Sequence, residues 1–150
     1  MRLQKDAAHV LLIEPEGVLR EVLALALEDD GRRVTTRSYV GEVVADVAAL
    51  EPDLIVLELP PGLLAAGVLR LRAHPATART PILLCTGAVR EAEALAELFA
   101  AIGVPVLAKP FDIDELLVQV RFGLDSLGES SNGLNDLPIS PLADAGCYLD

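Results

Sequence analysis

Residues 52–59 have the sequence PDLIVLEL, and this stretch decides the fold. Its four central residues, 54–57, are all aliphatic, without the polar alternation of a strand that has one wet face. A strand covered by helices on both faces has such an unbroken apolar run, which is typical of parallel sheets. The residues Pro60, Pro61 and Gly62 follow and end the run. The stretch therefore predicts a central strand of a parallel sheet.

The rest of the chain repeats this pattern, with predicted strands and helices in alternation. The predicted strands are 9–13, 33–38, 53–59, 81–87 and 104–108. The predicted helices are 16–30, 41–50, 63–73, 90–102 and one that begins at Asp112, which can cap it. Alternating βα units predict the α/β class. We expect a flavodoxin-like, doubly wound, five-stranded parallel sheet in the order 2-1-3-4-5, with helices on both faces.

Composition and charge limit the function classes. The chain has 150 residues, 52% of them hydrophobic, with 12 Lys and Arg against 23 Asp and Glu, for a net charge of −11. Such a charge repels nucleic acid and anionic membrane surfaces. No apolar run reaches the roughly 20 residues of a membrane span, and the first residues are not typical of a signal peptide. We therefore expect a cytoplasmic protein without nucleic-acid or membrane partners.

The domain organisation follows from a change in composition near residue 128. Residues 1–127 contain all the predicted strands and helices and form one domain of ordinary size. Residues 128–150 are rich in Gly, Ser, Asn and Pro and contain four acids without Lys or Arg. This composition predicts a flexible acidic tail. Its scattered apolar residues make a docking segment the alternative.

Polar side chains follow the predicted strands at their carboxyl ends, where ligands bind in this fold. These residues are Glu14, Glu16, Glu58, Thr86 and Lys109. Acids, a hydroxyl and an ammonium together are what phosphoryl transfer to a carboxylate needs, namely a nucleophile, ligands for a divalent metal and donors to the phosphoryl oxygens. This edge of the sheet is the candidate site.

The order of these residues resembles the response regulator receiver domains of two-component signalling, over nearly all of residues 8–127. Five segments carry the resemblance, in the family's order and spacing. They are 10–16 (VLLIEPE), 52–58 (PDLIVLE), 71–77 (LRAHPAT) leading to 80–82 (TPI), 84–87 (LCTG) and 109–111 (KPF).

The resemblance implies a role for each matched residue. Glu58 falls where receiver domains carry the phosphoacceptor aspartate. Thr86 and Lys109 match the hydroxyl and the lysine that contact the phosphoryl group, and Pro110 matches the family's cis-proline. Val106 falls at the switch position on the fifth strand, which is usually Tyr or Phe.

The acidic end of the site departs from the family. Glu14 and Pro15 fall where receiver domains have their pair of metal-binding acids, and Glu16 follows as a substitute ligand. Pro15 has no side-chain oxygen, so an Mg²⁺ site built from Glu14 and Glu16 is impaired, and we expect no obligatory cofactor. Glu58 is one methylene longer than aspartate, which disfavours in-line transfer. We expect the Glu58 carboxylate to reach toward Thr86 and Lys109 and to pair with Lys109.

These departures predict an atypical, stand-alone receiver domain that is not an enzyme. We expect it to act by protein contact without conventional aspartyl phosphorylation, with a signalling protein or a histidine kinase as partner. The resemblance places docking or homodimerisation on the face formed by helix 90–102, strand 104–108 and the helix from Asp112.

Two alternatives remain open. In the first, Glu58 accepts a phosphoryl group, with Mg²⁺ held by Glu14 and Glu16. In the second, the fold binds a flavin or a nucleotide at the same crevice. No Gly-rich phosphate loop follows the first strand, which disfavours the second alternative.

Overall fold

The computed structural model describes residues 7–39, 41 and 49–129. The strands are β1 (His9–Ile13), β2 (Arg33–Arg37), β3 (Leu54–Leu57), β4 (Ile82–Thr86) and β5 (Val106–Ala108). The helices are α1 (Gly17–Asp29), α3 (Leu64–Ala73), α4 (Val89–Ala94), α5 (Ala96–Ala101) and α6 (Ile113–Glu129). Most of the helix predicted for 41–50, and the predicted tail beyond residue 129, lie outside the described residues.

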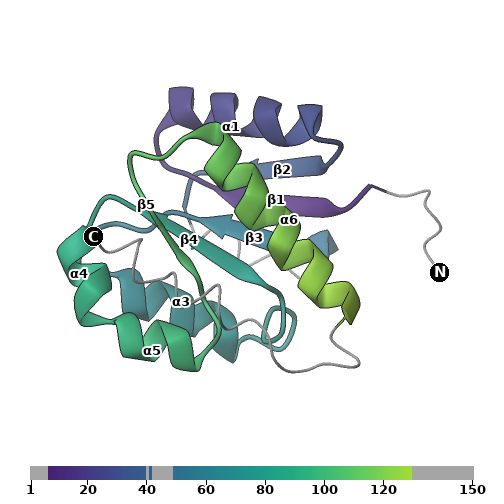
Figure 1. Ribbon diagram of the computed structural model, residues 1–150. Coiled ribbons are helices and arrows are strands. Elements are labelled where there is room, and N and C mark those ends of the chain that lie inside the picture. Colours follow the sequence, from purple (N-terminus) through teal and green to yellow (C-terminus); the bar gives the residue numbers. More distant parts are fainter. Residues whose placement is uncertain (1–6, 40, 42–48, 130–150) are drawn as a thin grey trace.

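The sheet confirms the predicted topology. Its strands are all parallel and follow the order β2-β1-β3-β4-β5. The central strands β1 and β3 are buried along their whole length, as their unbroken apolar sequences require. Helices α1 and α6 cover one face, and α3, α4 and α5 cover the other (Figure 1). Within the described residues, no helix is long and apolar enough to cross a membrane.

Alternate residues of β1 divide the core into two layers. Leu11 and Ile13 pack toward α3, α4 and α5, whereas Val10 and Leu12 pack toward α1 and α6. Each layer therefore draws on one set of alternating strand residues, as expected when successive side chains point to opposite faces. The helices packed on both faces of the sheet therefore hold the carboxyl ends of the strands in place.

The structure corrects one predicted element and trims others. The helix predicted for 90–102 is divided into α4 and α5 at Leu95, whose ψ of 12° departs from helical geometry. Backbone hydrogen bonds still run through the break, because Leu95 N–H donates to the Glu91 carbonyl and Phe99 N–H donates to that of Leu95. The predicted strands 53–59 and 104–108 are shortened to the residues of β3 and β5.

Side-chain caps fix the loops at the carboxyl edge of the sheet. Glu16 caps α1 by accepting a hydrogen bond from the Leu19 N–H at 3.1 Å. Helix α3 has no cap from its own first residues. Glu91 of α4 supplies one, accepting from the N–H groups of Gly62 at 2.6 Å and Leu64 at 3.2 Å. Helix α4 thereby holds the loop that follows Glu58.

Gly67 allows α3 to lie against Leu59, and we expect Gly67→Ala to destabilise the protein. A Cβ at this position would lie 2.5 and 2.6 Å from the methyl carbons of the buried Leu59. The strain should cost about 1–3 kcal/mol, more than the helix propensity of alanine returns. Gly17→Ala is the matched control, since its nearest atom is Arg20 Nη2 at 3.7 Å. Urea denaturation measures both variants, and equal stabilities would contradict this packing.

Candidate functional site

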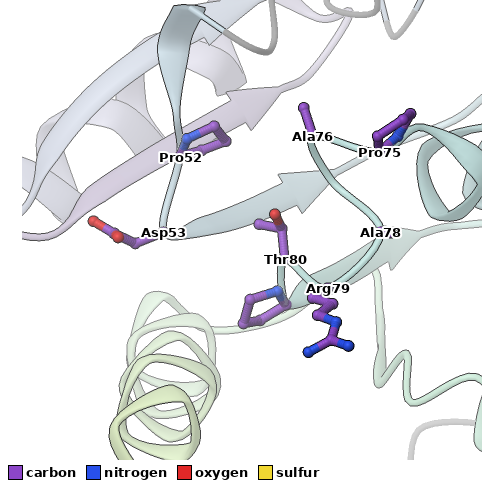
Figure 2. Close-up of a pocket in the computed structure, with 8 residues that line it drawn as sticks. Pro52, Asp53, Pro75, Ala76, Ala78, Arg79 and Thr80 are labelled. Carbon is purple, nitrogen blue, oxygen red and sulfur yellow. The ribbon is translucent and has the colours of Figure 1, made fainter.

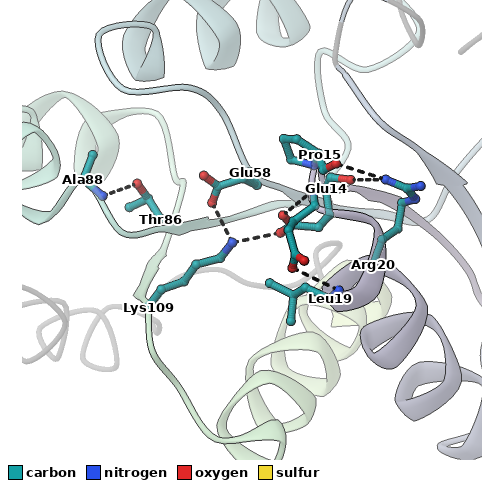
Figure 3. Close-up of polar contacts among 9 residues, drawn as sticks. Glu14, Pro15, Leu19, Arg20, Glu58, Thr86, Ala88 and Lys109 are labelled. Atoms are coloured by element: carbon teal, nitrogen blue, oxygen red, sulfur yellow. Dashed lines mark hydrogen bonds and ion pairs between the residues drawn. The ribbon is translucent and has the colours of Figure 1, made fainter.

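The carboxyl ends of β1, β3, β4 and β5 place the predicted site residues at one edge of the sheet (Figure 3). Glu14 and Glu58 directly follow the neighbouring strands β1 and β3, and the Glu58 N–H donates to the Ile13 carbonyl at 2.9 Å. Lys109 follows β5, and its N–H donates to the Thr86 carbonyl at 2.8 Å. Main-chain hydrogen bonds therefore fix these side chains at their base.

The Lys109 ammonium lies between two carboxylates. Its Nζ donates a hydrogen bond to Glu14 Oε1 at 2.9 Å and lies 3.2 Å from Glu58 Oε1. The Glu14 side chain is only 3% exposed, and those of Lys109 and Glu58 are 22% and 16% exposed. The predicted pairing of Glu58 with Lys109 is present in the structure. The stronger contact is with Glu14, which the sequence reasoning had not paired with the lysine.

The two carboxylates have different relations to the lysine. Glu58 Oε1 is buried, and its contact with Lys109 is an ion pair that lacks the hydrogen-bond geometry of the Glu14 contact. Burial raises the pKa of the Glu58 carboxyl, and the charge of Glu14 adds to the rise against the opposing effect of Lys109. Burial alone would lower the pKa of Lys109. The hydrogen bond with Glu14 and the charges of both acids outweigh burial and raise it. The ammonium is therefore charged at neutral pH, whereas burial disfavours the charged form of Glu58.

The loop between β1 and α1 is held by contacts that sequence reasoning missed. The second oxygen of Glu14, Oε2, accepts from the Glu16 N–H at 3.1 Å. Arg20 Nη1 donates to the carbonyl of Glu14 at 2.8 Å and lies 3.4 Å from that of Pro15. The sequence offered one signal for this contact, because Arg20 falls in the first turn of α1, just after this loop. Arg20 places a second cation beside the acids.

Three predicted residues take no part in the lysine cluster. Glu16 is exposed, and its Oε1 is engaged as the cap of α1. The Thr86 hydroxyl is buried and accepts from the Ala88 N–H at 2.9 Å, with no hydrogen bond to Glu58 or Lys109. Val106, the predicted switch residue, is 6% exposed and packs in the core layer of α3, α4 and α5. The Lys109–Pro110 peptide bond is cis, as predicted.

The residues present do not fit the Mg²⁺ site that the receiver-domain resemblance implies. Lys109 lies between Glu14 and Glu58, where a divalent cation would have to contact both carboxylates. Glu16 is engaged by α1, and Pro15 offers no side-chain ligand. Residues 7–39, 41 and 49–129 contain no group of three or more His, Cys, Asp or Glu placed to hold a metal ion.

A separate hollow lies at the opposite edge of the sheet, before β3 and β4 (Figure 2). Its volume is about 300 Å³, and its lining includes Asp53, Arg79 and Thr80. Asp53 is partly engaged, because its carboxylate accepts from the His9 N–H at 2.7 Å. The hollow shares no residue with the predicted site.

The chain is similar in sequence to regulators of transcription. No protein-family model matches it. It is 32% identical over 118 residues to the KDP operon transcriptional regulatory protein KdpE of Escherichia coli. This match covers 77% of this chain and 51% of KdpE. The chain spans about half the length of the curated transcriptional regulators that it matches.

Solved structures of receiver domains match over almost their whole length. Chemotaxis response regulator CheY4 of Vibrio cholerae is 26% identical with a TM-score of 0.67, covering 79% of this chain and 99% of CheY4. The receiver domain of sensor histidine kinase PA1611 from Pseudomonas aeruginosa, solved with a magnesium ion in its active site cleft, is 25% identical with a TM-score of 0.68. This match covers 80% of this chain and 99% of that domain.

We expect Glu58→Gln to stabilise the protein at neutral pH. A folded-state pKa above the ordinary 4.5 means that the folded protein binds more protons than the unfolded chain, so stability falls as the pH rises through the raised value. The variant should match the wild type near about pH 4 and exceed its stability at about pH 7.5. Urea denaturation at both pH values measures this, with the exposed Glu97→Gln as control. A variant less stable than wild type at both pH values would contradict the assignment.

Lys109→Met should destabilise the protein strongly. The substitution leaves the buried Glu14 charge without its cation, and breaking such a pair typically costs about 3–5 kcal/mol. Adding Glu14→Gln to this variant removes the uncompensated charge and should restore part of the loss. Denaturation of the single and double variants at neutral pH is the measurement. A single variant within about 1 kcal/mol of wild type would show that the pair is worth no more than an exposed one.

Proposed function

Because this chain belongs to the response regulator receiver domains of two-component signalling, we propose that it transmits a signal by protein contact without taking up a phosphoryl group. In this proposal the domain catalyses no reaction of its own. The observation that carries the proposal is the Lys109 ammonium, held between the carboxylates of Glu14 and Glu58.

Phosphoryl transfer to a carboxylate needs groups that are free to stabilise the transferred phosphoryl oxygens. In this site the one ammonium at the sheet edge is engaged by two acids of its own chain. A phosphoryl group would therefore have to displace existing contacts, and the excess of acids over cations around it would repel its charge.

Glu58 supports the same conclusion from the acceptor side. Its carboxylate already contacts Lys109. In the family, the lysine at this position contacts the phosphoryl group. Glutamate carries less charge and fewer acceptor oxygens than a phosphoryl group, so it imitates only part of that contact. We propose that Glu58 holds the domain in one state, and that a partner protein reads this state.

The receiver domain of PA1611 was solved with magnesium coordinated in its active site cleft. In this chain Pro15 follows Glu14, and Lys109 contacts the acids that remain. These departures favour the phosphate-independent proposal over a phosphoacceptor role for Glu58.

The proposed partners are signalling proteins, with a histidine kinase as one class. Because the chain spans about half of its curated relatives, a stand-alone action is likewise a proposal. The homodimer predicted through residues 90–102, 104–108 and the helix from Asp112 stays a prediction.

We expect neither Mg²⁺ nor beryllofluoride, a mimic of the phosphoryl group, to bind at the site. Amide NMR shifts of Glu58, Thr86 and Lys109 should stay unchanged in a titration with both. Intact-mass spectrometry after incubation with acetyl phosphate should show no phosphoryl adduct. The matched control is the double variant Pro15→Asp and Glu58→Asp, which restores the family's acids and should respond to Mg²⁺. Saturable shifts in the wild type, or an adduct on Glu58, would instead establish the metal-dependent phosphoacceptor.

A further inference from the structure

The stretch from residue 59 to residue 90 contains no acid, although the chain as a whole has a net charge of −11. Arg70 and Arg72 lie in the last turn of α3, and Arg79 lies in the loop that leads to β4. None of these three arginines has an ion pair with another described residue. This part of an acidic protein is therefore cationic.

The loop between α3 and β4 carries positive charge that no carboxylate balances. Arg72 Nη1 donates to the carbonyls of Thr80 at 2.7 Å and Thr77 at 3.3 Å. Burial lowers the pKa of the Arg72 guanidinium, and no acid acts against this effect. Arg79 is exposed and forms no hydrogen bond or ion pair with the described part of the chain. Arg79 is thus available to an anionic group.

The hollow at the amino edge of the sheet lies against this loop (Figure 2). Its walls are largely apolar, formed by Pro52, Pro75, Ala76, Ala78 and Pro81. Its charged residues are Arg79 and Asp53, and the Asp53 carboxylate points away from Arg79. A volume of about 300 Å³ is at the lower end of the range for ligand pockets. The hollow therefore suits a few apolar side chains that are accompanied by an acid.

Helix α6 leads the chain to this hollow. A Cβ at Gly123 would lie 2.5 Å from the Leu54 side chain and 3.9 Å from Cβ of Pro81. Leu54 begins β3 and Pro81 lines the hollow, so α6 passes the starts of the central strands. Six residues later, at Glu129, the helix has advanced about 9 Å further along its axis. The next segment of the chain therefore starts beside the amino edge.

The sequence after α6 has the composition that the hollow suits. Residues 130–150 contain three acids and no Lys or Arg. Within them, residues 134–142 have the sequence LNDLPISPL, in which Asp136 is the one charged residue among apolar ones. Seven extended residues span about 23 Å, so Asp136 is within reach of Arg79. Pro138 and Pro141 restrict the backbone and so reduce the entropy lost on binding.

Other occupants fit the hollow less well. Nucleic acid is repelled by the net charge of the protein. A free inorganic anion would meet Arg79 but would leave the apolar walls uncovered. An acidic segment of another protein would find the same surface, but a segment attached close by has an effective concentration in the millimolar range, about what a second protein rarely reaches.

We propose that residues 134–142 of this chain bind in the hollow, with the Asp136 carboxylate paired to Arg79 and the apolar side chains packed on the proline walls. The contact would join the end of α6 to the loop after α3, which lie over opposite faces of the sheet. This inference goes beyond the proposed function and does not depend on it, because the hollow shares no residue with the site around Lys109.

The test is paramagnetic broadening of amide NMR signals in the full chain, with a nitroxide on Cys147. Labelling is selective because Cys85 is buried. The label follows the proposed contact by five residues, so the amides of Asp53 and 76–80 should be broadened. Amides at the opposite edge of the sheet, such as that of Thr86, should keep their intensity. Added salt should weaken the broadening, since the ion pair is exposed.

Charge reversal tests the pairing itself. Arg79→Glu should lower the equilibrium constant for the contact about fivefold, because it replaces the attraction of an exposed pair with repulsion. Adding Asp136→Arg to this variant should restore the broadening. The matched control is Arg90→Glu, which changes the net charge equally on an exposed residue of α4 and should leave the broadening unchanged.

Four outcomes would overturn the proposal. The first is broadening spread evenly over exposed amides, and the second is equal broadening in wild type and Arg79→Glu. The third is broadening that appears only when spin-labelled protein is mixed with unlabelled ¹⁵N protein, which would assign the contact to a second copy. The fourth is a shift of the hollow amides on addition of a polyglutamate peptide without broadening from Cys147, which would assign the hollow to an acidic partner.

Discussion

The contact of the Lys109 ammonium with two carboxylates is the constraint on which the site depends. Glu14 is almost fully buried at the end of a core strand, and a buried carboxylate without a cation is strongly unfavourable. Lys109 supplies that cation. The same ammonium also forms an ion pair with Glu58, whose charged form burial disfavours. In the proposed function, a lysine so engaged is not free for an incoming phosphoryl group, and the acids beside it are not free for a metal.

The parallel sheet explains why residues 95 positions apart in sequence can meet. Strands β1, β3, β4 and β5 end at the same edge, and the aliphatic layers on both faces hold them in register. Arg20 fixes the loop after β1, and Glu91 fixes the loop after β3. Because that first loop leads directly into α1, the start of this helix depends on the contacts of the site.

The sequence predicted the fold class, the strand order and the pairing of Glu58 with Lys109, because aliphatic strand runs and strand-end polar residues are local signals. It could not show which of the two carboxylates lies closer to Lys109. The closer approach of Glu14 depends on how the side chains at the ends of β1, β3 and β5 pack. The sequence also could not show that the Thr86 hydroxyl, at the same edge of the sheet, accepts from the nearby Ala88 N–H. The break at Leu95 had no Gly or Pro to mark it, and the long-range cap from Glu91 spans 27 residues.

The most direct test of this account is the ¹⁵N NMR signal of the Lys109 side-chain ammonium, followed through a pH titration with and without Mg²⁺. The account predicts that the ammonium titrates with a pKa above the ordinary 10.5. Its signal should be unaffected by Mg²⁺ and should move when Glu14 is replaced by Gln. A pKa at or below the ordinary value, or a saturable response to Mg²⁺, would contradict the claim that this lysine is the internal cation of the site.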